Sequence, residues 1–225
     1  MERHIYFIGA HPDDLIGSAG AALLFQAKGG YRLHIVDYTR GERGLVSQGV
    51  SMEECSSTRV AEEEKVAGML GAELHFMPEI DGEAYAGKET VQLLAELFRR
   101  MPPAAIFLHW PVDSHPDHIM CYAGTMAAMR DAAASAEILF FEESVQTRSM
   151  PVAYYLPLPA EIMEKKLVIC RAYACQNGED DLASRKLCEA QYNGWKAGSQ
   201  YAECYGSYQL PLPGSASILN DIMET

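Results

Sequence analysis

The first 141 residues alternate between short apolar runs and longer segments with helical periodicity, and this alternation limits the fold more than any other feature. Apolar runs of strand length, separated by amphipathic helices, are typical of parallel sheets that are buried on both faces. We therefore expect an α/β fold, with a doubly wound, Rossmann-like, mostly parallel sheet and helices on both faces. The expected strands lie at residues 4–10, 32–38, 73–77, 104–109 and 138–141.

Start and stop signals place the helices between these strands. Ser51 and Glu54 form a capping box, which predicts a helix that ends before Gly71. The remaining helices are expected at residues 15–28, 89–100 and 118–133. The pattern weakens after residue 150, where it predicts a strand at 153–156, a helix at 161–170 and then a polar tail rich in Tyr and Gly. Because no repeat and no long linker interrupts the chain, residues 1–225 are expected to form one domain.

Composition excludes several classes of partner. The chain has 18 Lys and Arg against 31 Asp and Glu, a net charge of −13, which disfavours binding to nucleic acid. No apolar stretch approaches the roughly 18 residues of a membrane span, so membrane insertion is not expected. The first residues lack an apolar leader, and the six cysteines form no C-x-x-C pair. These features predict a cytoplasmic protein with free thiols, and they are compatible with a homo-oligomer.

The expected fold also predicts where a ligand binds. If the first five strands have the order 3-2-1-4-5, the crevice lies beyond the carboxyl ends of the first and fourth strands. The two loops that meet there read Ala-His-Pro-Asp-Asp at residues 10–14 and Asp-Ser-His-Pro-Asp-His at residues 113–118. The first turn has no G-x-G-x-x-G, which disfavours NAD, and the chain has neither a P-loop nor G-x-S-x-G.

A catalytic divalent metal suits these two loops. His11, Asp14 and His118 supply two imidazoles and a carboxylate, the ligand types of a catalytic zinc site that leaves a fourth position for water. Fe²⁺ is an alternative ion. Asp13 lies beside a ligand and is expected to act as the general base for the water. Acids at the start of a helix also complement its dipole, so the inference depends on both loops together.

Further roles follow from the same loops. His115 is expected to donate a hydrogen bond to a developing oxyanion, with Asp117 or Asp113 fixing its tautomer. His109 ends the fourth strand beside the site without a predicted role.

The helix after residue 51 contributes an inward-facing charged stripe. Its members, spaced to share one helical face, are Cys55, Arg59, Glu62, Val66, Met69 and Leu70. Two interpretations of Arg59 stay open: it holds substrate hydroxyls, or it forms an internal ion pair with Glu62.

These motifs resemble the LmbE or PIG-L family of zinc-dependent N-deacetylases. The resemblance is carried by residues 10–14 with 115–118, and it is supported by 39–44, by Arg59-x-x-Glu62 and by 201–203. It implies a hydrolase that removes the acetyl group from a small molecule or glycoside containing N-acetylglucosamine. Leu15 stands where many members have an acid, and we interpret it as a helix-packing residue.

The resemblance also implies roles for single residues. The residues so assigned are His11, Asp14 and His118 as zinc ligands, Asp13 as base and His115 as oxyanion partner. Asp113 stands where some relatives have an extra acid or hydrogen-bond donor, and we expect Glu42, Arg59 and Asp113 to contact the substrate. Two alternatives remain: an amidase for a larger acyl group on an amino-sugar conjugate, and a non-catalytic metal- or sugar-binding module. Asp13 favours an enzyme, because a non-catalytic binding module does not need a carboxylate that acts as a base on the water. The residues leave the natural substrate, the physiological metal and the oligomeric state open.

Overall fold

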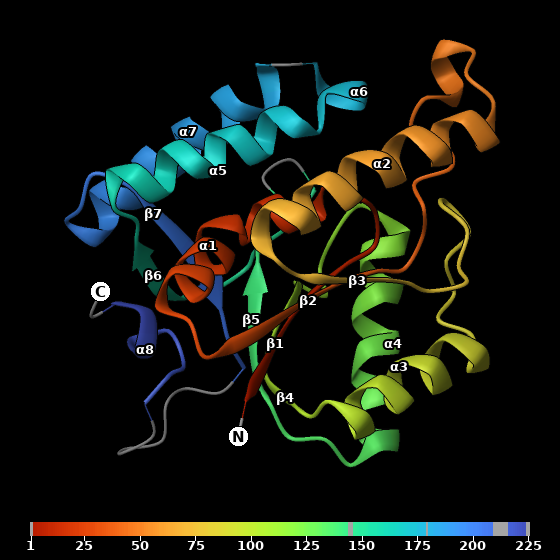
Figure 1. Cartoon of the computed structure of the whole chain (residues 1–225), viewed down its shortest axis with the longest axis horizontal. Coiled ribbons are helices and arrows are strands. Elements are labelled where there is room, and N and C mark those ends of the chain that lie inside the picture. Colours follow the sequence, from red (N-terminus) through yellow and green to blue (C-terminus); the bar gives the residue numbers. More distant parts are fainter. Residues whose placement is uncertain (1, 144–145, 179, 209–215, 224–225) are drawn as a thin grey trace.

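Seven strands form one mixed sheet in the part of the chain that the computed structural model describes, residues 2–143, 146–178, 180–208 and 216–223. Their order is β3-β2-β1-β4-β5-β7-β6 (Figure 1). The first five pair in parallel, whereas β7 joins β5 and β6 antiparallel. The expected fold class and the order 3-2-1-4-5 are confirmed. The strands are β1 (Arg3–Gly9), β2 (Tyr31–Asp37), β3 (Glu73–Phe76), β4 (Pro103–His109), β5 (Glu137–Phe141), β6 (Val152–Pro157) and β7 (Ala202–Gly206).

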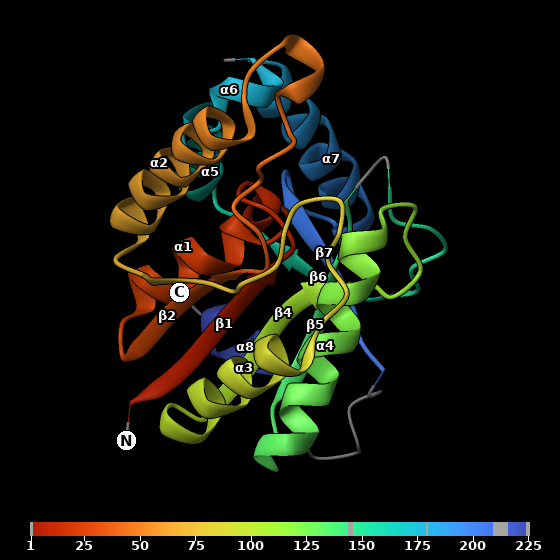
Figure 2. The ribbon, with the colours of Figure 1, turned by 90° about the vertical axis from the view of Figure 1, so that its right-hand side faces the viewer.

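Helices cover both faces of this sheet. Helices α3 and α4 lie on one face, and α1, α2 and α5 lie on the other (Figure 2). No helix among the described residues is both long and apolar enough to span a membrane. The α-helices are α1 (Ala19–Lys28), α2 (Met52–Leu70), α3 (Lys88–Arg100), α4 (Pro116–Ala132), α5 (Ala160–Ala172), α6 (Ala174–Asn177), α7 (Asp181–Ala197) and α8 (Asn220–Met223), with 3₁₀ turns η1 (Asp14–Gly17) and η2 (Val46–Gln48).

The central strands are apolar on both sides because each face is covered by helices. In β1, Ile5 and Phe7 enter the core layer under α1 and α5, whereas Tyr6 and Ile8 enter the layer under α3 and α4. Successive side chains of a strand point to opposite faces, so a strand buried on both faces has a continuous apolar run. This burial explains why the strands were predicted so closely from the sequence.

Two helix starts differ from their predictions for local reasons. The helix expected from Leu15 begins as the 3₁₀ turn η1, because the Asp14 carboxylate accepts the backbone N–H groups of Ala10 and His11 (2.8 and 2.9 Å). This tight turn delays α1 to Ala19. The helix expected from residue 118 begins two residues earlier, with Pro116 in its first turn. Proline favours that position because its fixed φ suits a helix start.

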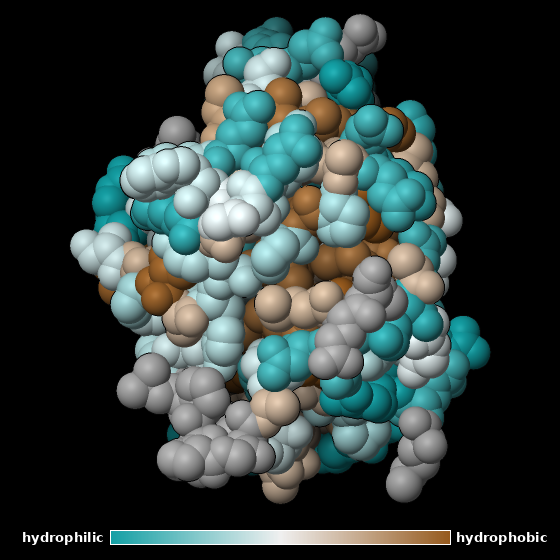
Figure 3. All heavy atoms as spheres, turned by 90° about the vertical axis from the view of Figure 1, so that its left-hand side faces the viewer, coloured by the Kyte–Doolittle hydropathy of each residue, from teal (hydrophilic) through white to brown (hydrophobic). Residues whose placement is uncertain are grey.

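The expected polar tail is wrong for residues 181–197, which form α7. Its sequence looks polar, yet Leu182, Ala183 and Ala190 pack into the core. Lys186 is also buried, beside Glu189 (3.1 Å) and Glu143 (3.5 Å), so its charge is balanced. Figure 3 shows this side of the molecule, where apolar surface is exposed in the middle of the face and polar residues surround it. Part of the predicted Tyr- and Gly-containing tail, residues 209–215, lies outside the described residues.

Candidate metal centre and active site

The predicted metal ligands meet where the loops after β1 and β4 converge. His11 Nδ1 lies 3.6 Å from Asp14 Oδ2, and His118 Nε2 lies 3.7 Å from Asp14 Oδ1. All three side chains are buried. The β1–β4 pairing creates this convergence, because both strands are parallel neighbours and end at the same sheet edge. We call these three residues the deep cluster.

The deep cluster fits a divalent cation. One donor atom from each of the three residues lies within 4.8 Å of the others, and two imidazoles with a carboxylate are a donor set of catalytic zinc sites. Burial opposes the charged form of Asp14, yet the imidazoles of His109 and His118 hold its pKa well below the usual range. Burial likewise opposes protonation of His11, but the carboxylates of Asp117, Asp14 and Asp81 hold its pKa well above the usual range. The surroundings therefore stabilise positive charge at this position, as a metal site requires.

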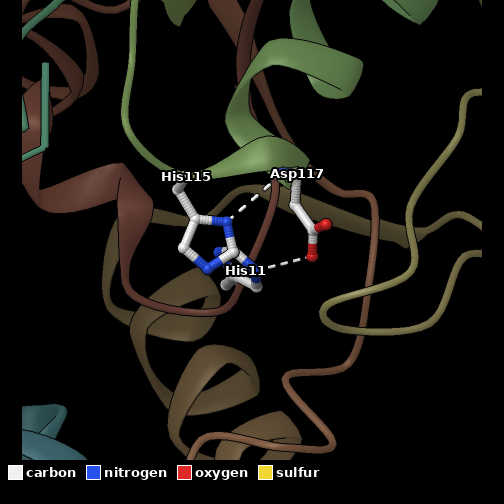
Figure 4. Close-up of side chains that lie close together, drawn as sticks. All are labelled: His11, His115 and Asp117. Carbon is white, nitrogen blue, oxygen red and sulfur yellow. Dashed lines mark hydrogen bonds and ion pairs between the residues drawn. The ribbon is translucent and has the colours of Figure 1, made fainter.

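Two carboxylates orient the imidazole of His11. Its Nε2 lies 3.2 Å from both Asp117 Oδ2 and Asp81 Oδ1, and Figure 4 shows the contact with Asp117. Asp117 also accepts the backbone N–H groups of Gly82 (2.6 Å) and Ala84 (3.3 Å). A carboxylate behind a histidine ligand fixes its tautomer and raises its basicity. This arrangement leaves Nδ1 of His11 for a metal.

A carboxylate lies behind His118 in the same way. Asp113 Oδ1 is 3.2 Å from His118 Nδ1, and the Asp113 side chain is fully buried. Asp113 also accepts the backbone N–H of His115 (2.7 Å) and the hydroxyl of Thr147 (3.1 Å). The structure thus places Asp113 behind a predicted metal ligand, away from the cleft surface where a substrate contact was expected.

His115 is the N-cap of α4, and its orientation follows from that position. Its Nδ1 accepts the backbone N–H of Asp117 at 3.3 Å, so the neutral ring carries its proton on Nε2 (Figure 4). Burial, with the nearby rings of His11 and His118, lowers the pKa of His115. The sequence led us to expect that an Asp117 or Asp113 carboxylate fixes this tautomer. The structure uses the Asp117 backbone for it, and the Asp117 carboxylate turns to His11.

Asp13, the predicted base, faces the cleft from a strained backbone. Its φ of 100° lies in a region that non-glycine residues rarely occupy. Its N–H donates to Glu63 (3.1 Å), and its carboxylate accepts from Arg59 (3.0 Å) and Asn177 (3.3 Å). Burial raises the pKa of Asp13, and the Arg59 guanidinium opposes that rise. These contacts hold the carboxylate toward the cleft.

The ion-pair partner predicted for Arg59 is wrong. Arg59 is buried and donates to Asp13 and to the carbonyl of Pro12, whereas Glu62 accepts from the backbone N–H and the thiol of Cys175 (both 2.9 Å). The inward acid of α2 is instead Glu63, which follows Arg59 by four residues and so lies nearly above it.

The end of the predicted stripe also differs. Met69 is 39% exposed, and Ala67 is buried in its place. Arg59 is only 4% exposed, and it lines the cleft beside Asp13.

The glycine-rich loop after β2 makes room for Arg59. A Cβ on Gly41 or Gly44 would lie 2.6 or 2.7 Å from Arg59 Nη1, so larger residues would collide with the guanidinium. Gly41 also has a φ of +67°, which favours glycine.

Glu42, predicted as a substrate contact, accepts the backbone N–H of Asp81 at 3.1 Å. It thereby braces the loop whose Asp81 contacts His11. No residue spacing in the sequence links Asp81 to His11, because the two segments meet only in the folded chain.

The deep cluster and Asp13 open into a cleft of about 550 Å³. Arg59 and His115 also line this cleft, whereas Glu42, Asp113 and Asp117 are not among its lining residues. Residues that the sequence analysis did not single out line the remainder: Ile16, Arg43, Gly44, Asp81, Gly82, Glu143, Gln146, Gln176, Asn177, Leu182 and Arg185. Gln176 and Asn177 belong to α6, and Leu182 and Arg185 belong to α7, so the C-terminal region builds one wall of the cleft.

His109 is a further residue whose role the sequence did not reveal. It is fully buried, stacks on His118 with ring centroids 3.9 Å apart, and places Nε2 2.9 Å from Asp14 Oδ2. Burial lowers the pKa of His109 to about 4. Its position at the carboxyl end of β4 is the one signal that could have identified it, because that sheet edge carries the site.

Together, the fold and the site define a class of α/β proteins that carry a His/Asp/His centre at the topological switch point. The chain belongs to the PIG-L family, described as GlcNAc-PI de-N-acetylase, whose model matches residues 6–129. The matched segment contains the deep cluster, Asp13 and His115.

Two characterised relatives match part of the chain. The 4-oxalmesaconate hydratase of Pseudomonas putida is 32% identical over 113 residues, which cover 48% of this chain and 44% of the relative. The 1D-myo-inositol 2-acetamido-2-deoxy-alpha-D-glucopyranoside deacetylase of Thermomonospora curvata is 29% identical over 164 residues, or 59% of this chain and 54% of the relative. The chain therefore spans about half the length of the curated relatives that it matches.

Solved structures share the fold over almost the whole chain. The conserved protein TT1542 from Thermus thermophilus has a TM-score of 0.76 at 25% identity and covers 95% of this chain and 99% of its own. N,N'-diacetylchitobiose deacetylase from Pyrococcus horikoshii has a TM-score of 0.74 at 23% identity, with 90% and 82% covered. The hydratase GalB from Pseudomonas putida has a TM-score of 0.78 at 22% identity, with 96% and 100% covered.

Proposed function

We propose that this protein is a metal-dependent hydrolase that removes the acetyl group from a small molecule or glycoside containing N-acetylglucosamine. One observation carries the proposal: the deep cluster, the Asp13 carboxylate and the His115 ring face one cleft of about 550 Å³. The family model and the deacetylase relative support the choice of an acetamide as the group that reacts.

The metal assigned to the deep cluster is Zn²⁺, with Fe²⁺ as the alternative. His11, Asp14 and His118 would hold it. When bound, such an ion supplies Lewis-acid polarisation and lowers the pKa of a water from about 15.7 toward about 7. Asp81 and Asp117 would orient His11, and Asp113 would orient His118, through the contacts described above.

The residues around that position can carry out each proton transfer of an amide hydrolysis. Asp13 takes a proton from the attacking water as its oxygen bonds to the acetamide carbon. The Nε2–H of His115 donates to the carbonyl oxygen as negative charge develops there, a contribution worth roughly 3 kcal/mol in comparable sites. Asp13 then passes its proton to the nitrogen as the C–N bond breaks, which gives acetate and a free amine.

The first test is acetate release from a panel of N-acetylglucosamine glycosides, with and without a chelator. Wild-type protein should release acetate, and the chelator should abolish release reversibly. Asp13→Asn should lower kcat about 10²–10⁴-fold while metal content stays unchanged, because asparagine tolerates the positive φ but cannot accept the proton. Loss of metal in Asp13→Asn would show that Asp13 is itself a ligand.

A second candidate function is hydration of an unsaturated carboxylate. The match to 4-oxalmesaconate hydratase favours it, at 32% identity over 113 residues. Asp13 could take a proton from water as the water oxygen bonds to one carbon of a double bond, and could return that proton to the other carbon. Assaying 4-oxalmesaconate beside the acetylated panel distinguishes the two: turnover of the acid alone would replace the deacetylase proposal.

The panel also addresses two narrower alternatives. Faster release of a longer acyl chain than of acetate would make the protein an amidase for larger groups. Tight sugar or metal binding with no turnover of any panel member would make it a binding module. A small amino-sugar compound as substrate, a cytoplasmic location and assembly with further copies stay predictions from the sequence.

A further inference from the structure

A second group of histidines lies on the same sheet, away from the cleft. His4 in β1, His34 in β2 and His75 in β3 form a row across three neighbouring strands. His4 Nδ1 is 2.9 Å from His34 Nε2, and His34 Nδ1 is 3.3 Å from His75 Nε2. His34 lies three residues before Asp37, the last residue of β2, so the row sits roughly 10 Å back from the sheet edge that carries the cleft.

Three donor atoms in this row have the spacing of a metal site. His34 Nδ1 lies 3.3 Å from His75 Nε2 and 3.7 Å from Glu73 Oε2, and the three donor atoms lie within 4.8 Å of one another. Tetrahedral zinc with bonds of about 2.0–2.1 Å separates its ligand atoms by roughly 3.3–3.4 Å. The corresponding distances in the deep cluster are 3.6 and 3.7 Å, so the two groups are equally well spaced.

The surroundings of His34 hold its ring in the orientation that a ligand needs. When Nδ1 binds a cation, Nε2 carries the proton and can donate it to His4 Nδ1, 2.9 Å away. The Tyr6 ring stacks on His34 with centroids 4.5 Å apart and an interplanar angle of 15°. Tyr6 is itself held by a hydrogen bond from its hydroxyl to the Met101 carbonyl (2.8 Å). His4 and Tyr6 thus have the orienting role that partner groups have behind histidine ligands.

An ion can reach this group from solvent. His34 is fully buried, but His75 is partly exposed and the Glu73 side chain is 50% exposed. Both belong to β3, the outer strand at that edge of the sheet (Figure 1). A bound ion would therefore join the edge strand to β2 and keep its remaining coordination position open to water.

We propose that His34, Glu73 and His75, named here the edge cluster, form a second divalent-cation site. Two imidazoles and one carboxylate suit Zn²⁺ and neighbouring transition metals better than Mg²⁺ or Ca²⁺, which prefer oxygen ligands. The site binds its ion independently of the deep cluster and clamps β3 to β2. It does not depend on the proposed deacetylase activity.

The test counts zinc ions per folded chain by equilibrium dialysis against buffered free Zn²⁺, followed by elemental analysis. Wild-type protein should bind two ions, and His75→Gln should bind one. Glu73→Gln, which keeps both imidazoles, should weaken the second binding step at least about tenfold. Glu89→Gln in the first turn of α3 is the matched control and should bind two ions with unchanged affinities. One ion in wild-type protein, or two in His75→Gln, would overturn the proposal.

A second measurement isolates the edge cluster. The His11→Ala, His118→Ala double variant should still bind one ion, and adding His75→Gln should remove it. Zn²⁺ should also raise the Tm of the double variant, and the rise should disappear with His75→Gln. A double variant that binds no zinc while its circular dichroism is native would contradict a site at the edge cluster. The proposed function is tested separately, because His75→Gln should leave the rate of acetate release unchanged.

Discussion

The deep cluster and the edge cluster use the same types of donor on the same sheet, but their surroundings differ. In the deep cluster, carboxylates lie behind both imidazoles: Asp117 and Asp81 behind His11, and Asp113 behind His118. In the edge cluster, the group behind His34 is another imidazole, His4. Negative charge behind a ligand raises its basicity, so the deep cluster should bind its ion more tightly.

The two clusters also differ in what faces the ion. The deep cluster opens into the cleft beside Asp13, a carboxylate fixed by Arg59 and Asn177, and beside His115. The edge cluster lies at the outer strand, and its single carboxylate, Glu73, is half exposed. The difference teaches that suitably spaced donors define only a position where an ion can be held. Catalysis additionally requires a base and a hydrogen-bond donor held beside it.

The largest expected effect separates the clusters by function. His118→Ala should lower acetate release at least about 10³-fold, because it removes a ligand of the ion that activates water. His75→Gln should change the same rate less than about twofold. Rates measured at saturating Zn²⁺, with metal content determined on the same samples, check both. A stronger loss in His75→Gln than in His118→Ala would reverse the assignment of the two sites.

The next prediction concerns Arg59, a buried cation that lies beside the deep cluster. Arg59→Ala should cost about 3–5 kcal/mol of unfolding free energy, because it leaves the Asp13 carboxylate without its buried cation. Arg59→Lys should recover part of this loss, since lysine keeps the charge but is shorter and lacks the guanidinium Nη2 that donates to both the Pro12 carbonyl and Asp13.

Glu62→Gln is the control for Arg59 and should change stability within about 0.5 kcal/mol. Denaturant midpoints compare the three variants. Equal losses of unfolding free energy in Arg59→Ala and Glu62→Gln would instead support an ion pair between Arg59 and Glu62, one of the two interpretations that the sequence left open.

A smaller effect tests the carboxylates behind the ligands. Asp113→Asn should weaken zinc binding at the deep cluster about 10–100-fold and leave the edge cluster unaffected, because only His118 loses its partner. Competition with a chromophoric chelator measures both affinities. Unchanged affinity at the deep cluster would mean that Asp113 serves only to hold the loop through His115 and Thr147.

The last expected effect is a pH dependence of stability that originates beside the deep cluster. Burial raises the pKa of Glu63 from 4.5 to about 8, so the folded chain holds a proton there that the unfolded chain releases. Stability from this group is full below about pH 4.5 and is lost as the pH rises toward 8, by at most about 1.4 kcal/mol per pH unit. Glu63→Gln should flatten that decline, whereas exposed Glu64→Gln should not. Denaturant midpoints at pH 5, 6.5 and 8 measure this dependence. An equal decline of stability with pH in both variants would contradict the role of Glu63.

Local sequence signals were sufficient for most of the fold. The strands of the parallel half were predicted because each is apolar on both faces, and Ser51, Gly29 and Gly71 mark helix ends through contacts within a few residues. The prediction failed at α7, where buried Lys186 and many polar residues hide the apolar face. That face is recognisable only against α5 and β7, which it covers.

The positions of the deep cluster, Asp13 and His115 were also within reach of the sequence. The alternation of elements predicts a doubly wound parallel sheet, and in the common strand order 3-2-1-4-5 the loops after β1 and β4 lie side by side. His11, Asp13 and Asp14 lie within five positions of the end of β1, and His115 and His118 lie six and nine positions after the end of β4. The shared direction of the two strands therefore brings them to one sheet edge.

Which groups support these residues was decided by the tertiary structure. Asp81 reaches His11 from a loop about 70 positions away. Glu63, rather than Glu62, is the inward acid of α2 and accepts the Asp13 N–H, and Asn177 contacts Asp13 from the C-terminal region. Asp113 contacts His118, Glu42 accepts the Asp81 N–H, and neither of them lines the cleft. The physical reason is burial: a polar group enclosed by the fold must find a partner, and that partner depends on three-dimensional packing rather than on sequence spacing.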